Sequence, residues 1–276
     1  STPWPYQEKS DRDAEIARWV SWLDCQQDVL QMWQGRLEAL LTRHWPEATR
    51  ALKLSSATRM QMLMHYGGPS PLAEDEDASA RLASWGGRFL DSAKIRRMVD
   101  SAGATTGVRM HPEEVLQMQC YAEEAYQAYR AVQSAKRRLS ELSKQHPTLA
   151  RLAEVVGGPT ACVLWVAVGD PNNYHCGEAY RKAIGLNLKE RSSGKYRGKL
   201  KITKRGPAIA RRWLYFAAMR ILQTPEVRGW YEAKKRRDGD RGRGAVIAVM
   251  RKLALALYAV GACGEEFSLA RLFPGQ

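Results

Sequence analysis

The feature that most limits the possible folds is the seven-residue spacing of apolar side chains between residues 13 and 44. One seam of this segment carries Ile16, Leu23, Leu30 and Leu37. A second seam carries Trp19, Trp33 and Leu40, with Gln26 as a polar interruption. Apolar residues in heptad register predict a long helix that pairs with another helix. We expect this helix to end at Trp45-Pro46, because proline cannot continue it.

A second long helix is predicted to begin at Pro112, where Glu113 and Glu114 suit the first turn. Its seam consists of residues at alternating spacings of four and three: Tyr121, Ala125, Ala128, Val132, Ala135, Leu139 and Leu142. Both seams are coiled-coil candidates. Pairing between subunits is favoured here, which predicts a homo-oligomer (a dimer or a tetramer), and a plain intramolecular bundle is the alternative.

The positive charge of the chain is concentrated in one region. The formal net charge is +14, and residues 181–252 hold 22 Lys or Arg against 5 Asp or Glu, whereas the rest holds 21 against 24. Aromatic residues and glycines interleave with these cations. The distribution predicts a nucleic-acid partner, because each cation that contacts a phosphate releases condensed counterions. A solvated basic face or a ribosome-like tail is the alternative.

Other classes of protein are disfavoured by what the sequence lacks. We expect no membrane span, because no apolar stretch reaches the roughly 18 residues that cross a bilayer and the run from Leu253 to Cys263 is bounded by Lys252. No signal peptide is recognisable, so we expect a cytoplasmic protein without membrane contact. The five cysteines and five histidines are too scattered for a zinc site, which favours buried free thiols in a reducing compartment.

A glycine-rich turn follows a short helix that is predicted to end at Val156. It reads Gly157-Gly158-Pro159-Thr160-Ala161 and leads into an apolar helix, which is the outline of a helix-hairpin-helix. In that motif, backbone N–H groups at a helix N-terminus hold a DNA phosphate. Gly157, Gly158 and Thr160 are therefore candidate phosphate-binding residues.

The basic loop from Lys189 to Gly206 carries the candidate nucleophile. It reads KERSSGKYRGKLKITKRG, and a short β-ribbon is predicted over residues 199–203. Ser192-Ser193-Gly194 places two hydroxyls before a glycine, among cations that would stabilise charge developing on a phosphodiester. The candidate nucleic-acid-binding cations are Arg191, Lys195, Arg197, Lys199, Lys201, Lys204, Arg205, Arg211 and Arg212.

An ordered set of motifs over residues 148–262 resembles the C-terminal domain of insertion-sequence 110 transposases. The set comprises the Gly157–Ala161 turn, Val168-Gly169-Asp170-Pro171, Ser192-Ser193-Gly194-Lys195, Ile202-Thr203-Lys204-Arg205-Gly206, Arg211-Arg212 and the helix around Arg251-Lys252. The usual Pro-Gly-Ile-Gly turn of that family is replaced here by Val156-Gly157-Gly158.

The resemblance implies a catalytic arrangement. In that family a serine of the C-terminal domain is the nucleophile, and an N-terminal RuvC-like domain supplies four carboxylates for a divalent metal. The serine falls on Ser193, with Ser192 as the alternative. The last RuvC motif is matched by residues 9–14, with Asp11 and Asp13 as candidate Mg²⁺ ligands. The spacing is one residue shorter than the family's, and an acidic helix N-terminus is the alternative explanation.

The expected protein is mainly α. We expect a RuvC-like remnant over residues 1–14, a helical coiled-coil scaffold over 15–147 and a serine transposase domain over 148–276. Most of the α/β RuvC-like domain is expected to be absent, because no strand-rich segment precedes Lys9. This chain alone is then not expected to perform metal-assisted cleavage.

The resemblance implies a DNA transposase or recombinase that forms a phosphoserine intermediate. Its expected partners are donor DNA, target DNA and a bridge RNA, in the nucleoid of a bacterium or an archaeon. The alternative is a non-catalytic helical nucleic-acid-binding or assembly protein. A helix-hairpin-helix nuclease or repair factor is a third hypothesis.

Overall fold

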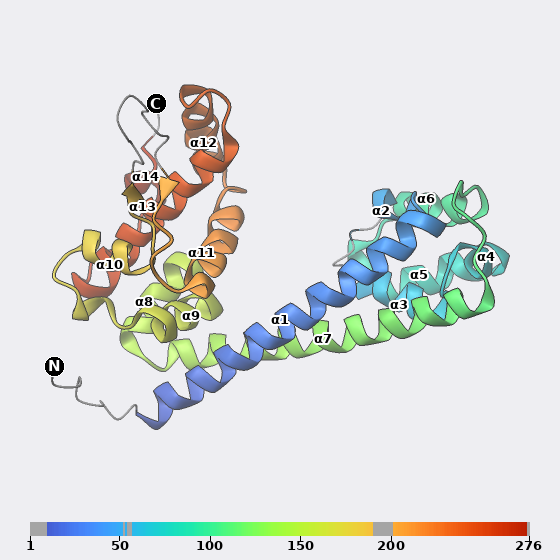
Figure 1. Cartoon of the computed structure of the whole chain (residues 1–276), viewed down its shortest axis with the longest axis horizontal. Coiled ribbons are helices and arrows are strands. Elements are labelled where there is room, and N and C mark those ends of the chain that lie inside the picture. The colour runs from blue at the N-terminus through green and yellow to red at the C-terminus, as the bar shows by residue number, and fades with distance from the viewer. Residues whose placement is uncertain (1–9, 52, 54–56, 190–200, 275–276) are drawn as a thin grey trace, which may run out of the picture. The chain divides into compact units, whose positions relative to one another are not determined.

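The computed structural model describes residues 10–51, 53, 57–189 and 201–274, and this part of the chain is almost entirely helical (Figure 1). The mainly-α prediction is confirmed. The longer helices are α1 (Asp11–His44), α3 (Ala57–Tyr66), α6 (Ser92–Gly103), α7 (Pro112–Lys144), α8 (Pro147–Val156), α9 (Gly158–Val168), α11 (Ala208–Ile221), α12 (Pro225–Arg237) and α13 (Gly242–Ala262). The shorter elements are α2 (Ala48–Ala51), α4 (Pro69–Glu74), α5 (Ala78–Gly86), η1 (Gly87–Phe89), η2 (Pro171–Asn173), α10 (Gly177–Ala183), α14 (Leu269–Leu272) and the strands β1 (Leu188–Lys189) and β2 (Lys201–Ile202).

The chain divides into two compact units. Unit 2 is Leu23–Ser134, and unit 1 is Ser1–Trp22 together with Ala135–Gln276. The packing therefore changes inside α1 and α7, whereas the boundaries expected at residues 14 and 147 follow sequence motifs. The difference arises because each long helix is continuous and contributes one end to each unit.

In unit 2 the seams of α1 and α7 face each other within the chain. Leu30 and Leu37 are only 5% and 1% exposed, and Ala125 is fully buried. The Trp33 ring lies 5.2 Å from the Tyr121 ring, and the two helices run side by side (Figure 1). Subunit pairing through the Leu30–Leu37 seam is therefore wrong, and the alternative of an intramolecular bundle is confirmed for it.

The end of α1 is anchored to the segment that precedes α7. The Glu47 carboxylate accepts hydrogen bonds from the Thr105 hydroxyl at 2.8 Å and from the Thr106 hydroxyl and backbone N–H. These bonds, the Thr106 backbone bond foremost, lower the pKa of Glu47 from 4.5 to about 2. Nδ1 of the buried His44 ring lies 2.8 Å from the Val108 carbonyl oxygen.

The spacing of apolar residues over 78–99 predicts continuous helix, but the structure interrupts it. Gly87 adopts a φ of +50°, which ends α5, and Asp91 begins α6 by accepting a hydrogen bond from the Lys94 backbone N–H at 2.7 Å. The expectation missed this break because apolar spacing continues through it.

Helix α13 is the central helix of unit 1. It packs against α8, α10, α11 and α12 (Figure 1), and Gly261 lets it approach Pro171 and Leu152 closely. Helix α13 is long and apolar enough to cross a membrane by length and composition alone, which the expectation drawn from Leu253–Cys263 overlooked. Half of its apolar window is buried in the protein, as in a core helix.

All five cysteines are free, as their spacing predicted. The expectation that they are buried holds only for Cys162, whose thiol pKa is raised to about 12 by burial. Cys25, Cys120 and Cys263 are exposed, because they lie on outward-facing positions of their segments.

Candidate nucleic-acid interface

A two-stranded ribbon closes the basic loop. Strands β1 and β2 pair antiparallel, with Leu188 opposite Ile202 and Lys189 opposite Lys201. The Thr203 N–H extends this ladder by donating to the Asn187 carbonyl at 2.7 Å. The ribbon predicted around residues 199–203 is confirmed over Lys201–Ile202, and it pairs Lys189 with Lys201, the described residues on either side of 190–200.

A turn after β2 fixes the foot of the ribbon on α10. Lys204 has a φ of +55°, and Gly206, at +144°, lies against the Ala183 carbonyl where no Cβ has room. Arg211 ties the same turn to α11, because its Nη1 donates to the Gly206 carbonyl at 2.8 Å and to the Ile184 carbonyl at 3.3 Å. Arg211 is thus engaged in holding the ribbon, a role that its basic neighbourhood did not suggest.

The predicted cations that the structure describes do not share one environment. Lys201, Lys204 and Arg205 are exposed on the ribbon and its turn, where a phosphate has access to them. Arg212 is partly buried. Ser192 and Ser193 lie outside the described residues, as do Arg191, Lys195, Arg197 and Lys199.

Exposed aromatic side chains lie on α11, next to the ribbon in sequence. Tyr215 and Phe216 are 43% and 44% exposed, their rings are 6.1 Å apart, and Met219 is 37% exposed on the following turn. Exposed aromatic side chains beside cations are typical of surfaces on which unpaired bases stack.

The glycine-rich turn joins α8 and α9 as predicted, and the helix axes change direction by 118° across it. Gly157 has a φ of +82°, and its open side meets the Arg220 guanidinium, which donates to the Val156 carbonyl. A Cβ on Gly158 would lie 2.7 Å from Ser143 Oγ and 2.8 Å from Ser140 Cα of α7. Packing therefore requires both glycines, whether or not the turn also holds a phosphate. Thr160 does not fit the phosphate role, because its side chain is buried.

The candidate metal ligands lie at the N-terminus of α1. The Asp13 carboxylate accepts a hydrogen bond from Ser10 Oγ at 2.7 Å and another from Trp165 Nε1 at 2.9 Å. Ser10 Oγ also accepts from the Asp13 backbone N–H at 3.1 Å, so the pair caps the helix. Glu15, two residues after Asp13, forms an ion pair with Arg138, whose Nη2 lies 2.7 Å from Glu15 Oε1.

These residues do not form a complete metal site. Asp11 is exposed, both oxygens of Asp13 already accept hydrogen bonds, and no group of three or more His, Cys, Asp or Glu residues gathers anywhere in the described part of the chain. The arrangement favours the helix-capping explanation of Asp13. The Mg²⁺ site stays a prediction that needs further carboxylates.

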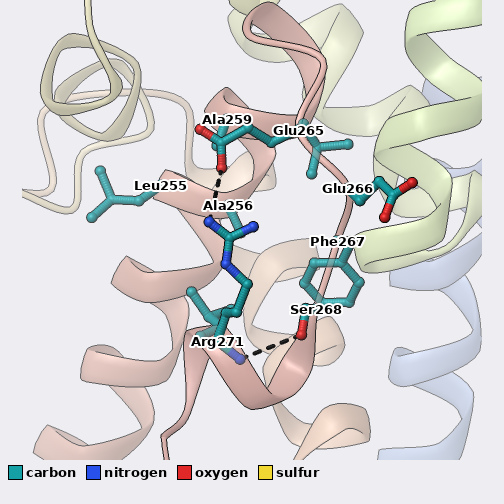
Figure 2. A pocket seen from close by; sticks show the side chains of 10 residues that line it. Leu255, Ala256, Ala259, Glu265, Glu266, Phe267, Ser268 and Arg271 are labelled. Atoms are coloured by element: carbon teal, nitrogen blue, oxygen red, sulfur yellow. Dashed lines mark hydrogen bonds and ion pairs between the residues drawn. The ribbon is translucent and has the colours of Figure 1, made fainter.

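Two hollows of the described part of unit 1 bear on function. One, of about 250 Å³, lies between the end of α13 and α14 (Figure 2). Within it Glu265 lies 3.8 Å from Arg271, and Ser268 caps α14. The other, of about 620 Å³, lies at the foot of the ribbon and is lined by polar residues that include His175, Lys182, Asn187 and Arg205. The second hollow adjoins the basic surface formed by Lys201, Lys204 and Arg205, since Arg205 lines it.

Sequence analysis missed three arginines that the fold places in unusual surroundings. Arg220 lies on the glycine-rich turn, and Arg181 and Arg251 lie on the packed helices α10 and α13. Each belongs to an amphipathic helix in which a basic residue is ordinary. Only the packing of segments distant in sequence distinguishes them.

Comparison with known proteins identifies one domain. Residues 148–232 match the family model described as Transposase IS116/IS110/IS902 family. The match begins with α8, includes the glycine-rich turn, both strands and α11, and ends within α12. No curated protein matches the chain.

Proposed function

We propose that the domain matched by the Transposase IS116/IS110/IS902 family model exchanges DNA strands through a serine nucleophile in residues 190–200. The observation that carries the proposal is the position of Ser192-Ser193-Gly194 within the matched domain, between two paired strands. Ser193 is the preferred nucleophile, because the glycine that follows it gives the backbone freedom, and Ser192 is the alternative.

The proposed step exchanges one phosphoester bond for another. The serine hydroxyl loses its proton and its oxygen forms a bond to phosphorus, while a deoxyribose oxygen leaves and takes up a proton. Attack by a hydroxyl of the second strand then reverses the exchange and releases the serine. Because the phosphoserine keeps the phosphoester linkage, no energy-supplying cofactor is needed.

The described residues contribute cations to this chemistry. Lys201, Lys204 and Arg205 are exposed where the ribbon meets its turn, and they would attract the DNA backbone. Arg211 would keep the ribbon at a fixed angle to α11 through its two carbonyl contacts. A bound Mg²⁺ would polarise a phosphoryl oxygen, but among the described residues Asp11 and Asp13 do not complete its site.

We further propose that the basic surface binds a guide RNA as well as DNA. The exposed Tyr215 and Phe216 rings support this, since they offer stacking surfaces for unpaired bases. The test is the absorbance ratio of the purified chain before and after ribonuclease treatment. RNA that ribonuclease removes supports a guided recombinase, and a nucleic-acid-free protein that binds DNA alone contradicts it.

The serine mechanism is tested with this chain fused to a RuvC-like domain of the family. We expect Ser193→Ala to abolish recombination and the covalent protein–DNA adduct while DNA binding is nearly unchanged. Nucleophile removal commonly costs many orders of magnitude in rate, whereas one neutral hydrogen bond contributes about 1 kcal/mol. Ser192→Ala is the matched control and should be milder. Activity of the double variant at the wild-type rate would contradict the mechanism.

A non-catalytic nucleic-acid-binding protein is the second candidate. It is favoured by the incomplete carboxylate site, because the described residues supply binding groups and no assembled catalytic cluster. In that case the fused protein binds DNA with steep salt dependence, forms no adduct, and is insensitive to both serine substitutions.

A further inference from the structure

Arg181 and Arg251 lie on α10 and α13, two helices that pack against each other. The two helices approach each other closely at Gly177 of α10. A Cβ on this residue would lie 3.1 Å from Leu255 Cδ2 and 3.4 Å from Tyr258 Cδ1 of α13. One turn forward along α10 is Arg181, and one turn back along α13 is Arg251. The side chains are close enough for the charge of Arg181 to act on Arg251.

Both guanidinium groups are partly buried without a neutralising partner. The Nε atom of each is buried and has no hydrogen-bond partner, and neither side chain forms an ion pair with any residue that the structure describes. Burial, and then the charge of Arg181, lower the pKa of Arg251. Two like charges held together in this way destabilise the fold unless an anion joins them.

We propose that Arg181 and Arg251 together bind one phosphate group of a nucleic-acid backbone. The inference rests on the proposed nucleic-acid function, and it adds a binding site outside the loop at residues 190–200. A guanidinium presents parallel N–H donors that match phosphate oxygens, and two of them offset the like-charge repulsion by sharing one anion. A protein carboxylate is a less suitable ligand, because residues 181–252 contain only 5 acidic residues against 22 basic ones.

A backbone hydrogen bond joins Arg181 to the segment that leads into the ribbon. The Arg181 carbonyl accepts a hydrogen bond from the Leu186 N–H at 3.2 Å, and Leu186 is followed by β1 after one residue. A backbone phosphate held by Arg181 and Arg251 would therefore be fixed relative to the ribbon, and the strand carrying it would be positioned for the neighbouring loop.

The first test is thermal unfolding in phosphate and in chloride at equal ionic strength. The site variants are Arg181→Gln and Arg251→Gln. The control is Arg137→Gln, which makes the same change in charge at an exposed position of α7. We expect phosphate to raise the wild-type midpoint beyond chloride, and we expect each site variant to lose this extra rise while matching or exceeding the wild-type midpoint in chloride. Site variants that melt earlier in chloride and keep the phosphate effect would show a structural role and overturn the inference.

The second test is affinity for a short DNA duplex and for a single-stranded RNA. Each site variant should bind about tenfold more weakly and should reduce the salt slope by about one, whereas Arg137→Gln should do neither. Weakening confined to DNA or to RNA identifies the source of the phosphate. If the wild type binds neither polymer, the proposed function fails; if it binds both and the site variants match Arg137→Gln, only this inference fails.

Discussion

Charged side chains are paired differently in unit 2 and in one part of the basic region of unit 1. In unit 2, Glu47 is satisfied by Thr105 and Thr106, and Asp75 binds both Tyr66 and Arg81. In the basic part of unit 1, Arg181 and Arg251 face each other without a carboxylate, and Lys201, Lys204 and Arg205 are exposed. Charges that are paired within the chain stabilise its fold, whereas charges left in excess on one surface indicate a partner of opposite charge.

The largest expected effect comes from placing charge on the buried seam of unit 2. Leu30→Asp combined with Leu37→Asp should lower the free energy of unfolding by several kcal/mol, because both positions are almost fully buried. Denaturant unfolding followed by circular dichroism measures it. Gln31→Asp, on the exposed side of α1, is the control. A folded double variant of smaller mass in solution would restore the seam as a subunit interface.

A smaller effect is expected at the glycine-rich turn of unit 1. Gly158→Ala should destabilise the fold by roughly 1–3 kcal/mol, since its Cβ would crowd the Ser140 backbone of α7. Gly229→Ala in α12 is the matched control, and it should stabilise by up to about 1 kcal/mol because nothing lies within 4 Å of its Cβ. Unchanged stability of Gly158→Ala with weaker DNA binding would instead favour a role in phosphate binding alone.

The smallest expected effect concerns the paired acid of unit 2. The pKa of Glu47 is lowered in the folded state, so its contribution is complete above its ordinary value of 4.5 and is lost as pH falls toward about 2. Glu47→Gln should lower the free energy of unfolding slightly at neutral pH, by about 1 kcal/mol or less, and the melting temperature falls with it. Its melting temperature should also fall less than that of the wild type between these pH values. Parallel acid profiles of the two proteins would contradict the assignment.

The helices were predictable because their boundaries are local. Pro112 occupies the first position of the helix that was expected there, since proline fits the first turn and disrupts later ones. The ribbon was also predictable from local sequence, because the apolar residues Leu200 and Ile202 alternate with polar ones. The interruption at Gly87 was missed, because a positive φ leaves the apolar spacing unchanged.

Two things were not predictable: which helix each seam packs against, and what the arginines contact. Both are determined by segments that are distant in the sequence. A heptad seam looks the same whether its partner helix belongs to the same chain or to another one. Arg211 lies in a basic motif, yet it binds the carbonyls of Ile184 and Gly206. Arg181 and Arg251 are 70 residues apart in the sequence, and only the packing of α10 against α13 brings them together. The assignment of Ser192 and Ser193 stays a prediction.

The most direct test of the contrast between the units is the salt dependence of nucleic-acid binding by this chain. The affinity for a DNA duplex is measured from low to physiological salt, for the wild type and for a triple variant, Lys201→Gln with Lys204→Gln and Arg205→Gln. We predict a steep loss of wild-type affinity with salt and a slope lower by roughly three in the variant, because each lost phosphate contact removes about one released counterion. Binding that is independent of salt, or an identical slope in the triple variant, would contradict the account.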